Sequence, residues 1–489
     1  MKNVIIIGSG IAGLAASVRL ANAGYKVNLL EKNDFAGGKL SEVLINGYRF
    51  DAGPSLFTMP ELIEELFEIS NIKTESHFSY VKLDHICRYF FQDDLIINAL
   101  ANPSDFANEI ENKTGEKAEK VIRHLEKAAE IYKLTAPVFI FKEWSYLQNL
   151  INPKFWKAFL NIRKLDVFST VHDANAKNFS HPAIIQLFDR YATYNGSNPY
   201  KAPATLNVIP HIEYNKGAFL PKKGMYSIIE SLITLAKAKG VNFHFNQEVK
   251  KICFDKSGVS GIETTKGFFP SKIIVSNSDI ELTYKMLGKE KKYSKAAKEK
   301  STSALVFNWG IKGKFNKLAL HNIFFTTDYK KEFEDLFDKK RIPADPTIYL
   351  FISSKMVASD APPGCENWFT MINMPAGIKV GDKEIAEIRK TVIEKISNRI
   401  GECFEDKIEC EWILTPEKLE DRTNSIGGAI YGNASNSKWS AFQRHQSRVP
   451  GIKGLYVCGG SVHPGGGIPL CLSSAKIAVN KIIKNEAKS

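Results

Sequence analysis

Three glycines and one glutamate near the start of the chain have the residue types and the spacing to form a ligand-binding site. Gly8 allows a tight turn, Gly10 lets the backbone approach a phosphate group, and Gly13 lets a following helix pack close to the turn. Glu31 comes later in the same stretch, and its carboxylate could accept hydrogen bonds from a ribose diol. Its charge also disfavours a phosphorylated ribose, since two anions repel. These residue types predict that the stretch binds a dinucleotide.

Regular elements must position these residues, and the surrounding sequence predicts such elements. Residues 4–7 form a short β-branched run, which is typical of a buried parallel strand. A helical pattern follows the glycines and ends at Gly24, and residues 27–30 predict a second strand that ends on Glu31. A tight turn without a ligand is the alternative interpretation. The complete pattern of strand, turn, helix, strand and acid favours dinucleotide binding.

Length, charge and cysteine content narrow the class of protein. A chain of 489 residues is too long to fold around one simple hydrophobic core, so two or three domains are expected. The net charge of +13 suggests an anionic partner, such as an acidic substrate or an anionic membrane surface. The alternative is a basic soluble protein without such a partner. No recognised nucleic-acid-binding module appears, so no nucleic-acid partner is predicted. Seven scattered cysteines form no CxxC pair, which predicts reduced thiols and neither a zinc site nor disulfides.

Two further glycine loops follow the first unit. Residues 35–40 read FAGGKL, and residues 46–55 read NGYRFDAGPS. A nicotinamide dehydrogenase does not usually need such loops, whereas a larger and more extended cofactor does. With these loops the sequence resembles the FAD-binding flavoproteins of the amine oxidase, protoporphyrinogen oxidase and carotenoid desaturase superfamily. Lys39 is at the position where that superfamily usually has an arginine. Its ammonium group can still reach a phosphate, but it cannot form the two parallel hydrogen bonds of a guanidinium.

The C-terminal region carries the most specific motif. Residues 454–460 predict a strand that runs into glycines, residues 461–470 read SVHPGGGIPL, and a helix of small residues is expected from Cys471. Glycines ahead of a helix offer backbone N–H groups to the flavin end of a cofactor or to its pyrophosphate. This pattern closely resembles the C-terminal signature of bacterial phytoene-desaturase-type carotenoid desaturases. The resemblance extends over nearly the whole chain.

Inner segments resemble the same desaturases. Residues 217–235 predict a glycine loop followed by a helix, and residues 241–249 alternate like a strand. The family places the backbone of a valine that corresponds to Val249 against the adenine. Residues 273–275 predict another buried strand, and Asn277 follows it in a polar turn. The resemblance implies that these segments return the chain to the cofactor domain.

The resemblance implies an α/β, Rossmann-like two-dinucleotide-binding-domain flavoprotein with a mixed-sheet substrate domain and a helical cap. It implies FAD as the cofactor, and no metal. No catalytic side chain is predicted, because the flavin itself is the catalyst; His463 could accept a proton, or could be a structural hydrogen-bonding residue. The predicted cofactor-binding residues are Gly8, Ser9, Gly10, Ile11, Ala12, Gly13, Glu31, Lys32, Gly38, Lys39, Leu40, Gly53, Pro54, Ser55, Val249, Asn277, Gly460, Val462, His463, Pro464, Gly467, Ile468 and Pro469.

The expected domains alternate along the chain. The FAD-binding domain is expected in three parts, with substrate-binding parts between them. The boundaries are 1–75, 216–285 and 446–489 for the FAD-binding domain, 76–215 for a helical, substrate-binding and membrane-associating region, and 286–445 for the substrate-binding domain.

The segments between the cofactor motifs suit a substrate site. Residues 305–309, 348–353 and 368–373 are strand-like and suit a sheet that forms one wall of an apolar tunnel, although each residue could equally be plain core. A polar and aromatic patch that includes Arg190 and Tyr194 could line the substrate site or a loop.

Residues 131–167 are rich in aromatic residues and lysines. Such a mixture suits a membrane interface, where rings lie at headgroup depth and cations meet anionic lipid. An ordinary helical cap with inward-facing aromatics is the alternative. No run of about 20 apolar residues predicts a spanning helix, and the N-terminus does not resemble a signal peptide. We therefore expect peripheral, monotopic attachment at the cytoplasmic face of the membrane, through Phe139, Phe141, Lys142, Trp144, Tyr146, Leu147, Leu150, Lys154, Phe155, Trp156, Lys157, Phe159, Leu160, Arg163 and Lys164.

The N-terminal motifs indicate a subgroup. GGKLSE at residues 37–42 and GYRFDAGPSLFT at residues 47–58 look most like the desaturases that act on hydroxylated carotenoids at the 3,4 bond. This resemblance implies an enzyme that introduces a C=C bond into an acyclic or monocyclic, 1-hydroxylated carotenoid end by hydride transfer to flavin. Only one GxGxxG is present, so oxygen or a membrane quinone is expected to take the electrons.

Several alternatives stay open. A phytoene desaturase proper or a flavin-dependent carotenoid isomerase would share these motifs. A flavin amine oxidase shares only the N-terminal ones, and the PGGGIPL ending argues against it. A non-catalytic lipid or prenyl carrier is the alternative of another class, since Rab GDP-dissociation inhibitors resemble this fold. The intact glycines disfavour a carrier.

Overall fold

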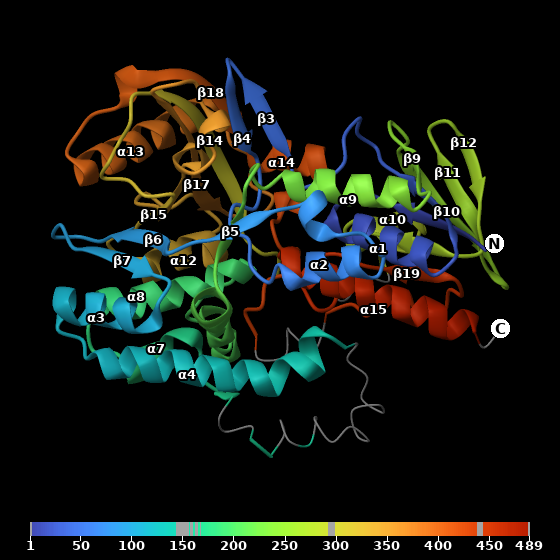
Figure 1. The fold of residues 1–489 in the computed structure, drawn as a ribbon, viewed down its shortest axis with the longest axis horizontal. Helices are drawn as coiled ribbons and strands as arrows, with labels where there is room; N and C mark the ends of the chain where they lie inside the picture. Colours follow the sequence, from blue (N-terminus) through green and yellow to red (C-terminus); the bar gives the residue numbers. More distant parts are fainter. Residues whose placement is uncertain are drawn as a thin grey trace.

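The computed structural model describes residues 2–142, 156, 160–161, 165–166, 168–291, 299–437 and 444–487. Figure 1 shows two halves, one around a parallel sheet near both termini and one around a larger mixed sheet. The termini lie close together, and Lys2 Nζ pairs with the Glu486 carboxylate at 2.8 Å. Among the described residues no helix has the length and apolar character needed to cross a membrane.

The parallel sheet has five strands, and every neighbouring pair is parallel. The structure confirms the strands predicted at residues 4–7, 27–30 and 273–275. Most residues of these strands are buried, as is typical of a parallel sheet. The sheet draws its strands from three distant parts of the chain, in the order β19 (Leu455–Val457), β13 (Ile274–Ser276), β1 (Asn3–Ile7), β2 (Lys26–Leu30) and β9 (Asn242–His244).

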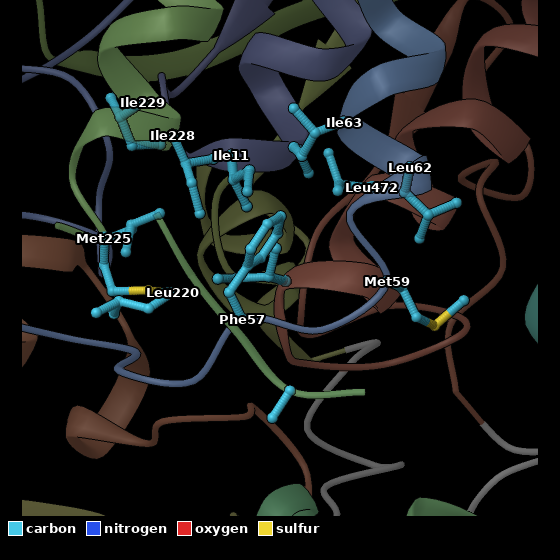
Figure 2. Packing of buried hydrophobic residues seen from close by; sticks show 14 of the residues in the cluster. Ile11, Phe57, Met59, Leu62, Ile63, Leu220, Met225, Ile228, Ile229 and Leu472 are labelled. Atoms are coloured by element: carbon cyan, nitrogen blue, oxygen red, sulfur yellow. The ribbon is translucent and has the colours of Figure 1, made fainter. Parts of the chain in front are cut away.

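Helices cover one face of this sheet, and a small antiparallel sheet covers the other. Helix α1 (Ile11–Asn22) contacts both α9 (Ser227–Ala238) and α15 (Ile468–Glu486), while α2 (Glu61–Glu68) packs on α15. Figure 2 shows Phe57 at the centre of the resulting core, between residues of α9 and residues of α2 and α15. The opposite face packs against α10 (Ile280–Met286) and the sheet of β10 (Val249–Asp255), β11 (Gly258–Thr264) and β12 (Gly267–Pro270).

Two local predictions need correction. The alternating segment 241–249 is not one strand, because β9 ends at His244 and β10 begins at Val249. Between them Asn246 adopts a left-handed conformation with φ of 53°, and the chain passes from the parallel sheet to the antiparallel one. The last helix begins at Ile468 and not at Cys471, because Pro469 fits the first helical turn, where its missing N–H leaves no bond unmade.

The mixed sheet has seven strands, of which only β15 and β6 pair in parallel. It confirms the predicted strands at residues 305–309, 348–353 and 368–373. Two of its strands, β6 and β7, come from the region 76–215. The strand order is β18 (Ile408–Leu414), β14 (Ser303–Lys312), β17 (Cys365–Met374), β16 (Ile348–Phe351), β15 (His321–Phe324), β6 (His85–Phe90) and β7 (Ile96–Leu100).

The two faces of the mixed sheet have different tasks. In β14 the odd-numbered residues Leu305, Phe307 and Trp309 belong to a core with α13 (Asp382–Ile400). The even-numbered Ala304 and Val306 face the opposite side and line a cavity. Figure 1 shows α13 on one side of this sheet and the helical cap on the other. One face therefore supplies stability and the other face is left for a ligand.

A helical cap closes the cavity side. It consists of α3 (Pro103–Thr114), α4 (Ala118–Thr135), α7 (Val171–Asn178) and α8 (Pro182–Asp189), with turns η4 (Arg190–Asn195), η5 (Ala204–Val208) and η6 (His211–Lys216). The remaining elements are β3 (Glu42–Ile45), β4 (Tyr48–Asp51), β5 (Tyr80–Lys82), β8 (Phe219–Pro221), α12 (Tyr329–Phe333), α14 (Pro416–Thr423), and the short turns η1 (Thr74–Ser76), η2 (Ala136–Ile140), η7 (Glu334–Asp338), η8 (Ser353–Lys355), η9 (Ala358–Asp360), η10 (Glu405–Lys407) and η11 (Ile426–Gly428).

A buried charge network joins the two halves. Asp51, at the end of β4, accepts hydrogen bonds from the backbone N–H groups of Met225 and Tyr226 at 2.9 and 3.0 Å, just ahead of α9. Arg49 donates to Asp51 at 2.7 Å and reaches Asp360 of the substrate half at 3.3 Å. These neighbouring carboxylates raise the pKa of Arg49 against the opposing effect of its burial.

We expect Gly13→Ala to destabilise the cofactor half. A Cβ at this position would lie 2.1 Å from the Gly8 carbonyl oxygen, so α1 would have to move away from β1. Overpacking of this kind costs about 1–3 kcal/mol, which corresponds to a melting temperature lowered by roughly 2–6 °C. Differential scanning calorimetry of the FAD-loaded protein measures it.

Gly381→Ala is the matched control. Gly381 precedes α13 with φ of −79°, and the nearest atom to its added Cβ is a Glu384 carboxylate oxygen at 3.8 Å. Its melting temperature should stay within about 1 °C of the parent protein. Equal melting temperatures for the two variants would contradict the close contact at Gly13.

Candidate functional site

A large cavity lies between the two sheets and the cap. Its volume is about 1070 Å³, at or above the roughly 300–1,000 Å³ of ordinary small-molecule sites. Glycine turns of the parallel sheet line one end. Apolar side chains such as Ile323, Phe369 and Met371, from the free face of the mixed sheet, line another part. The cavity therefore has room for a dinucleotide and for part of an apolar substrate.

Most of the predicted cofactor residues meet around this cavity, although they come from seven separate stretches of sequence. Ser9, Gly13 and Val462 do not line it. Those that do are Gly8, Gly10, Ile11, Ala12, Glu31, Lys32, Gly38, Lys39, Leu40, Gly53, Pro54, Ser55, Val249, Asn277, Gly460, His463, Pro464, Gly467, Ile468 and Pro469.

The residues behind the cavity surface have packing or positioning tasks. Ser9 donates its N–H and its hydroxyl to Glu31 Oε2, at 2.9 and 2.7 Å. The N–H of Asn33 donates to Glu31 Oε1 at 3.0 Å. These bonds hold the buried Glu31 carboxylate in place and leave Oε1 with acceptor capacity toward the cavity. Gly13 provides the close contact with Gly8, and Val462 is buried in the core beneath the C-terminal turn.

Two helix N-termini face the cavity without a side-chain cap. Gly10 precedes α1 and Gly467 precedes α15, and neither helix start is satisfied by a side-chain hydrogen bond. Free N–H groups at a helix start bind phosphate groups well. A Cβ on Gly10 would lie 2.8 Å from Asn277 Nδ2, so the turn has no room for a side chain. This cradle fits the diphosphate of an extended dinucleotide.

Two partly buried lysines supply positive charge along the cavity. Lys39 Nζ donates to the carbonyls of Ala429 and Ile430 at 2.8 and 2.7 Å, and burial lowers its pKa to about 8. Lys32 Nζ donates to Asn424 Oδ1 at 2.7 Å, and burial lowers its pKa also. For both lysines the effect of burial on the pKa outweighs that of the nearby carboxylates, so an anionic ligand would stabilise their charged forms.

The sequence motifs missed several polar residues of the cavity. Arg422 lies at the end of α14, stacked between Trp412 and Phe35 with its guanidinium 5.4 and 5.2 Å from their ring centroids. Arg444 donates to the carbonyls of Gly460 and Asn433, at 3.4 and 3.0 Å. Neither arginine belongs to a glycine motif, and only the tertiary fold brings them to the cavity. No local sequence signal would have found them.

The histidine of the C-terminal motif has a structural hydrogen bond. His463 Nε2 lies 2.8 Å from the carbonyl oxygen of Lys142, so this nitrogen carries a proton and donates it. A nitrogen that already donates cannot accept a proton from a substrate. Of the two interpretations of His463, the geometry favours the structural one.

Polar side chains also line the wall opposite the glycine turns. Ser55 Oγ lies 2.6 Å from the Tyr349 hydroxyl, which lies 2.8 Å from His321 Nδ1. Burial, with the nearby Arg190 charge, lowers the pKa of His321 to about 3, so the imidazole is neutral. The chain of hydrogen bonds fixes Ser55 in the loop that follows Gly53.

The fold and this cavity define an FAD-dependent oxidoreductase. The chain belongs to the family of flavin containing amine oxidoreductases, which it matches over residues 11–483. A triple mutant of putrescine oxidase shares the fold, with a TM-score of 0.65 at 11% identity over 99% of both chains.

Two relatives match over their full lengths. A 1-hydroxycarotenoid 3,4-desaturase of Flavobacterium sp. (strain P99-3) is 43% identical over 490 residues, which cover all of both chains. A 4,4'-diaponeurosporene oxygenase of Staphylococcus aureus (strain MSSA476) is 30% identical over 495 residues, covering 100% of this chain and 99% of the other. The resemblance to carotenoid desaturases predicted from the sequence is confirmed.

We expect FAD affinity to fall as the pH rises through the pKa of Lys39. The lysine is charged below about pH 8 and neutral above it, so its attraction for an anionic cofactor is lost on the alkaline side. Between pH 7 and pH 9.5 the dissociation constant should rise by about 5- to 30-fold, and a bound anion would move the midpoint upward. Flavin fluorescence titration of the apoprotein measures this.

Two variants, Lys39→Arg and Lys39→Met, distinguish the effect of the charge at residue 39 on FAD affinity from the effect of its side-chain shape. The arginine stays charged over this pH range, so this variant should lose most of the pH dependence while keeping its affinity at pH 7. The methionine should bind FAD weakly at both pH values. An unchanged pH dependence in Lys39→Met would show that Lys39 does not meet the cofactor.

Proposed function

We propose that this protein is a carotenoid desaturase that introduces a C=C bond at the 3,4 position of a 1-hydroxylated carotenoid end. The observation that carries the proposal is the large apolar cavity, continuous with the glycine cradle for FAD. A polyene offers few polar groups to hold, so an apolar channel is the means by which a protein can position it. The relative at 43% identity, a 1-hydroxycarotenoid 3,4-desaturase, supports the substrate class.

The chain's own residues bind and orient the substrate in this proposal. When bound, FAD supplies the acceptor for the hydride that leaves the allylic carbon. The free face of the mixed sheet, with Ile323, Phe369 and Met371, holds the polyene by apolar contact and excludes water. The neighbouring carbon gives up a proton, which passes to the solvent, and we propose oxygen or a membrane quinone as the final electron acceptor. The bond between the allylic carbon and this neighbouring carbon then becomes the new double bond.

We also propose that the protein attaches peripherally to the cytoplasmic face of a membrane through residues 131–167. A carotenoid dissolves in lipid, so its enzyme has to reach the bilayer. Exposed apolar side chains of this region support the proposal, with exposed fractions of 40% for Phe141, 44% for Trp156 and 80% for Leu160, and 73% for the adjacent Phe168. Phe139 lines the cavity. The predicted contacts that lie outside the described residues are Trp144, Tyr146, Leu147, Leu150, Lys154, Phe155, Lys157, Phe159, Arg163 and Lys164.

The mass of the product tests the proposed reaction. The FAD-loaded protein, incubated with a 1-hydroxylated acyclic carotenoid in liposomes, should yield a product lighter by two hydrogens, measured by mass spectrometry. A product of unchanged mass would indicate an isomerase, and one heavier by oxygen would indicate an oxygenase. Binding of the carotenoid with no product, in aerobic buffer and with added quinone, would favour a carrier.

Neutralising lysines of the proposed membrane segment should weaken membrane binding. Each lysine near an anionic surface contributes about 1 kcal/mol, so Lys142→Gln/Lys154→Gln/Lys157→Gln should reduce partitioning to anionic liposomes by roughly 10- to 100-fold. Liposome co-sedimentation measures the effect. As control, Lys379, Lys383 and Lys390, exposed residues at and before α13 on the opposite side of the molecule, are neutralised in the same way. Equal losses in both triple variants would reject a localised membrane site.

A further inference from the structure

A buried polar cluster interrupts the apolar wall of the cavity. Arg190, the first residue of η4, donates from Nη2 to the Tyr89 hydroxyl at 2.8 Å. Its guanidinium carbon lies 5.2, 4.9 and 5.1 Å from the ring centroids of Tyr89, Tyr191 and Tyr194. Glu213 of η6 accepts from the Tyr191 hydroxyl at 2.9 Å and from the Tyr194 hydroxyl, and lies 3.9 Å from Arg190.

The cluster is buried, and part of it faces the cavity. Arg190 is 7% exposed and Glu213 is 1% exposed. Arg190, Tyr194 and Glu213 line the cavity, whereas Tyr89 and Tyr191 lie behind them and are not part of its lining. We call Arg190, Tyr194 and Glu213 the polar subsite. A charged pair in an apolar wall is costly unless its hydrogen-bonding groups find partners.

One donor of Arg190 has no hydrogen-bond partner among the described residues. A guanidinium carries five N–H donors, yet Arg190 Nε makes no hydrogen bond to any described residue. The contact between Arg190 Nη1 and the Tyr194 hydroxyl is long, at 3.5 Å. A buried donor without a partner is expensive, and it is often completed by a ligand.

The polar subsite lies close to the C-terminal glycine turn. Asn195 follows Tyr194 directly and accepts a hydrogen bond from Arg444 at 3.2 Å. Arg444 also donates to the carbonyl of Gly460, in the C-terminal glycine turn, at 3.4 Å. The side chain of His321, on the other side, has its pKa lowered in part by the Arg190 charge. In this proposal the flavin end of the cofactor lies at the C-terminal glycine turn, so the subsite is close to the reacting carbons.

We propose that Arg190, Tyr194 and Glu213 bind the hydroxyl group of the carotenoid end and so place the neighbouring C–C bond against the flavin. This inference rests on the proposed function. In a 1-hydroxylated end that is desaturated between carbons 3 and 4, only carbon 2 separates the hydroxyl-bearing carbon from the reacting bond. The partner of the hydroxyl must consequently lie next to the flavin, where the polar subsite is.

The charges of the polar subsite match a neutral hydroxyl. A hydroxyl both accepts and donates hydrogen bonds, so Arg190 can donate to its oxygen while Glu213 accepts a hydrogen bond from its O–H group. Arginine and glutamate together carry no net charge, so the subsite offers no net attraction to a carboxylate or an ammonium group. Tyr194 keeps its own proton, because burial and the adjacent Glu213 raise its pKa. The polar subsite is thus a specificity determinant and leaves the redox chemistry unchanged.

Paired substrates test the proposal. The FAD-loaded protein is given a 1-hydroxylated acyclic carotenoid and the same carotenoid without the hydroxyl, and kcat/KM is compared. A hydroxyl-binding site should favour the hydroxylated substrate by about 10- to 100-fold, because the analogue leaves the buried groups unpaired. Glu213→Gln and Arg190→Met should reduce this ratio to within about threefold of unity, mainly by raising KM for the hydroxylated substrate.

Tyr191→Phe is the matched control. Like Tyr194, Tyr191 donates to Glu213, but Tyr191 does not line the cavity. Tyr191→Phe should lower the melting temperature and preserve the substrate ratio, whereas Tyr194→Phe should lower the ratio. If Arg190→Met fails to fold, Glu213→Gln and Tyr194→Phe decide the matter. Unchanged ratios in folded, flavin-loaded variants would show that the cluster is only structural.

A binding measurement separates this proposal from the proposed reaction. Dissociation constants of the two carotenoids follow from quenching of protein fluorescence, without turnover. Tighter binding of the hydroxylated carotenoid with no desaturation would support the polar subsite and reject the desaturase. Desaturation of both carotenoids with equal kcat/KM would reject the polar subsite and retain the desaturase.

Discussion

One buried carboxylate, that of Asp51, belongs to a network that links the cofactor half to the substrate half. Asp51 accepts the backbone N–H groups that precede α9 and pairs with Arg49, and Arg49 in turn reaches Asp360. Removing one member of such a network leaves an unpaired buried charge, which costs about 3–5 kcal/mol. The β3–β4 hairpin that carries Arg49 and Asp51 lies between the cofactor half and the substrate half. The network therefore links the two halves whose sheets line the cavity.

The cavity follows from a division of labour within each strand of the mixed sheet. Side chains that point toward α13 form a dense core, and their neighbours point toward the ligand space. The ligand-facing residues can change without loss of the core, because successive residues of a strand point to opposite faces. The substrate preference of such a fold can therefore vary while its architecture stays constant.

The sequence predicted the parts of the site that depend on local structure. The turns at Gly8 and Gly467 each lie between a strand and a helix, so residue order alone places their N–H groups. By contrast, 101 residues separate Tyr89 from Arg190 and 22 separate Tyr191 from Glu213. Long-range hydrogen bonds of this kind leave no periodic signal. The same limit explains the strand predicted at residues 241–249, where alternation continues across a change of sheet.

The assembly of the parallel sheet from three parts of the chain has a consequence for biosynthesis. β1 and β2 leave the ribosome first, yet their neighbour β13 pairs with β19, which begins at Leu455. At about 5–20 residues per second, roughly 20–90 s pass between translation of β2 and of β19. Throughout that interval the glycine turn lacks the C-terminal helix that completes its cradle. We therefore expect stable uptake of the cofactor only after synthesis is nearly finished, since the cradle draws on both ends of the chain.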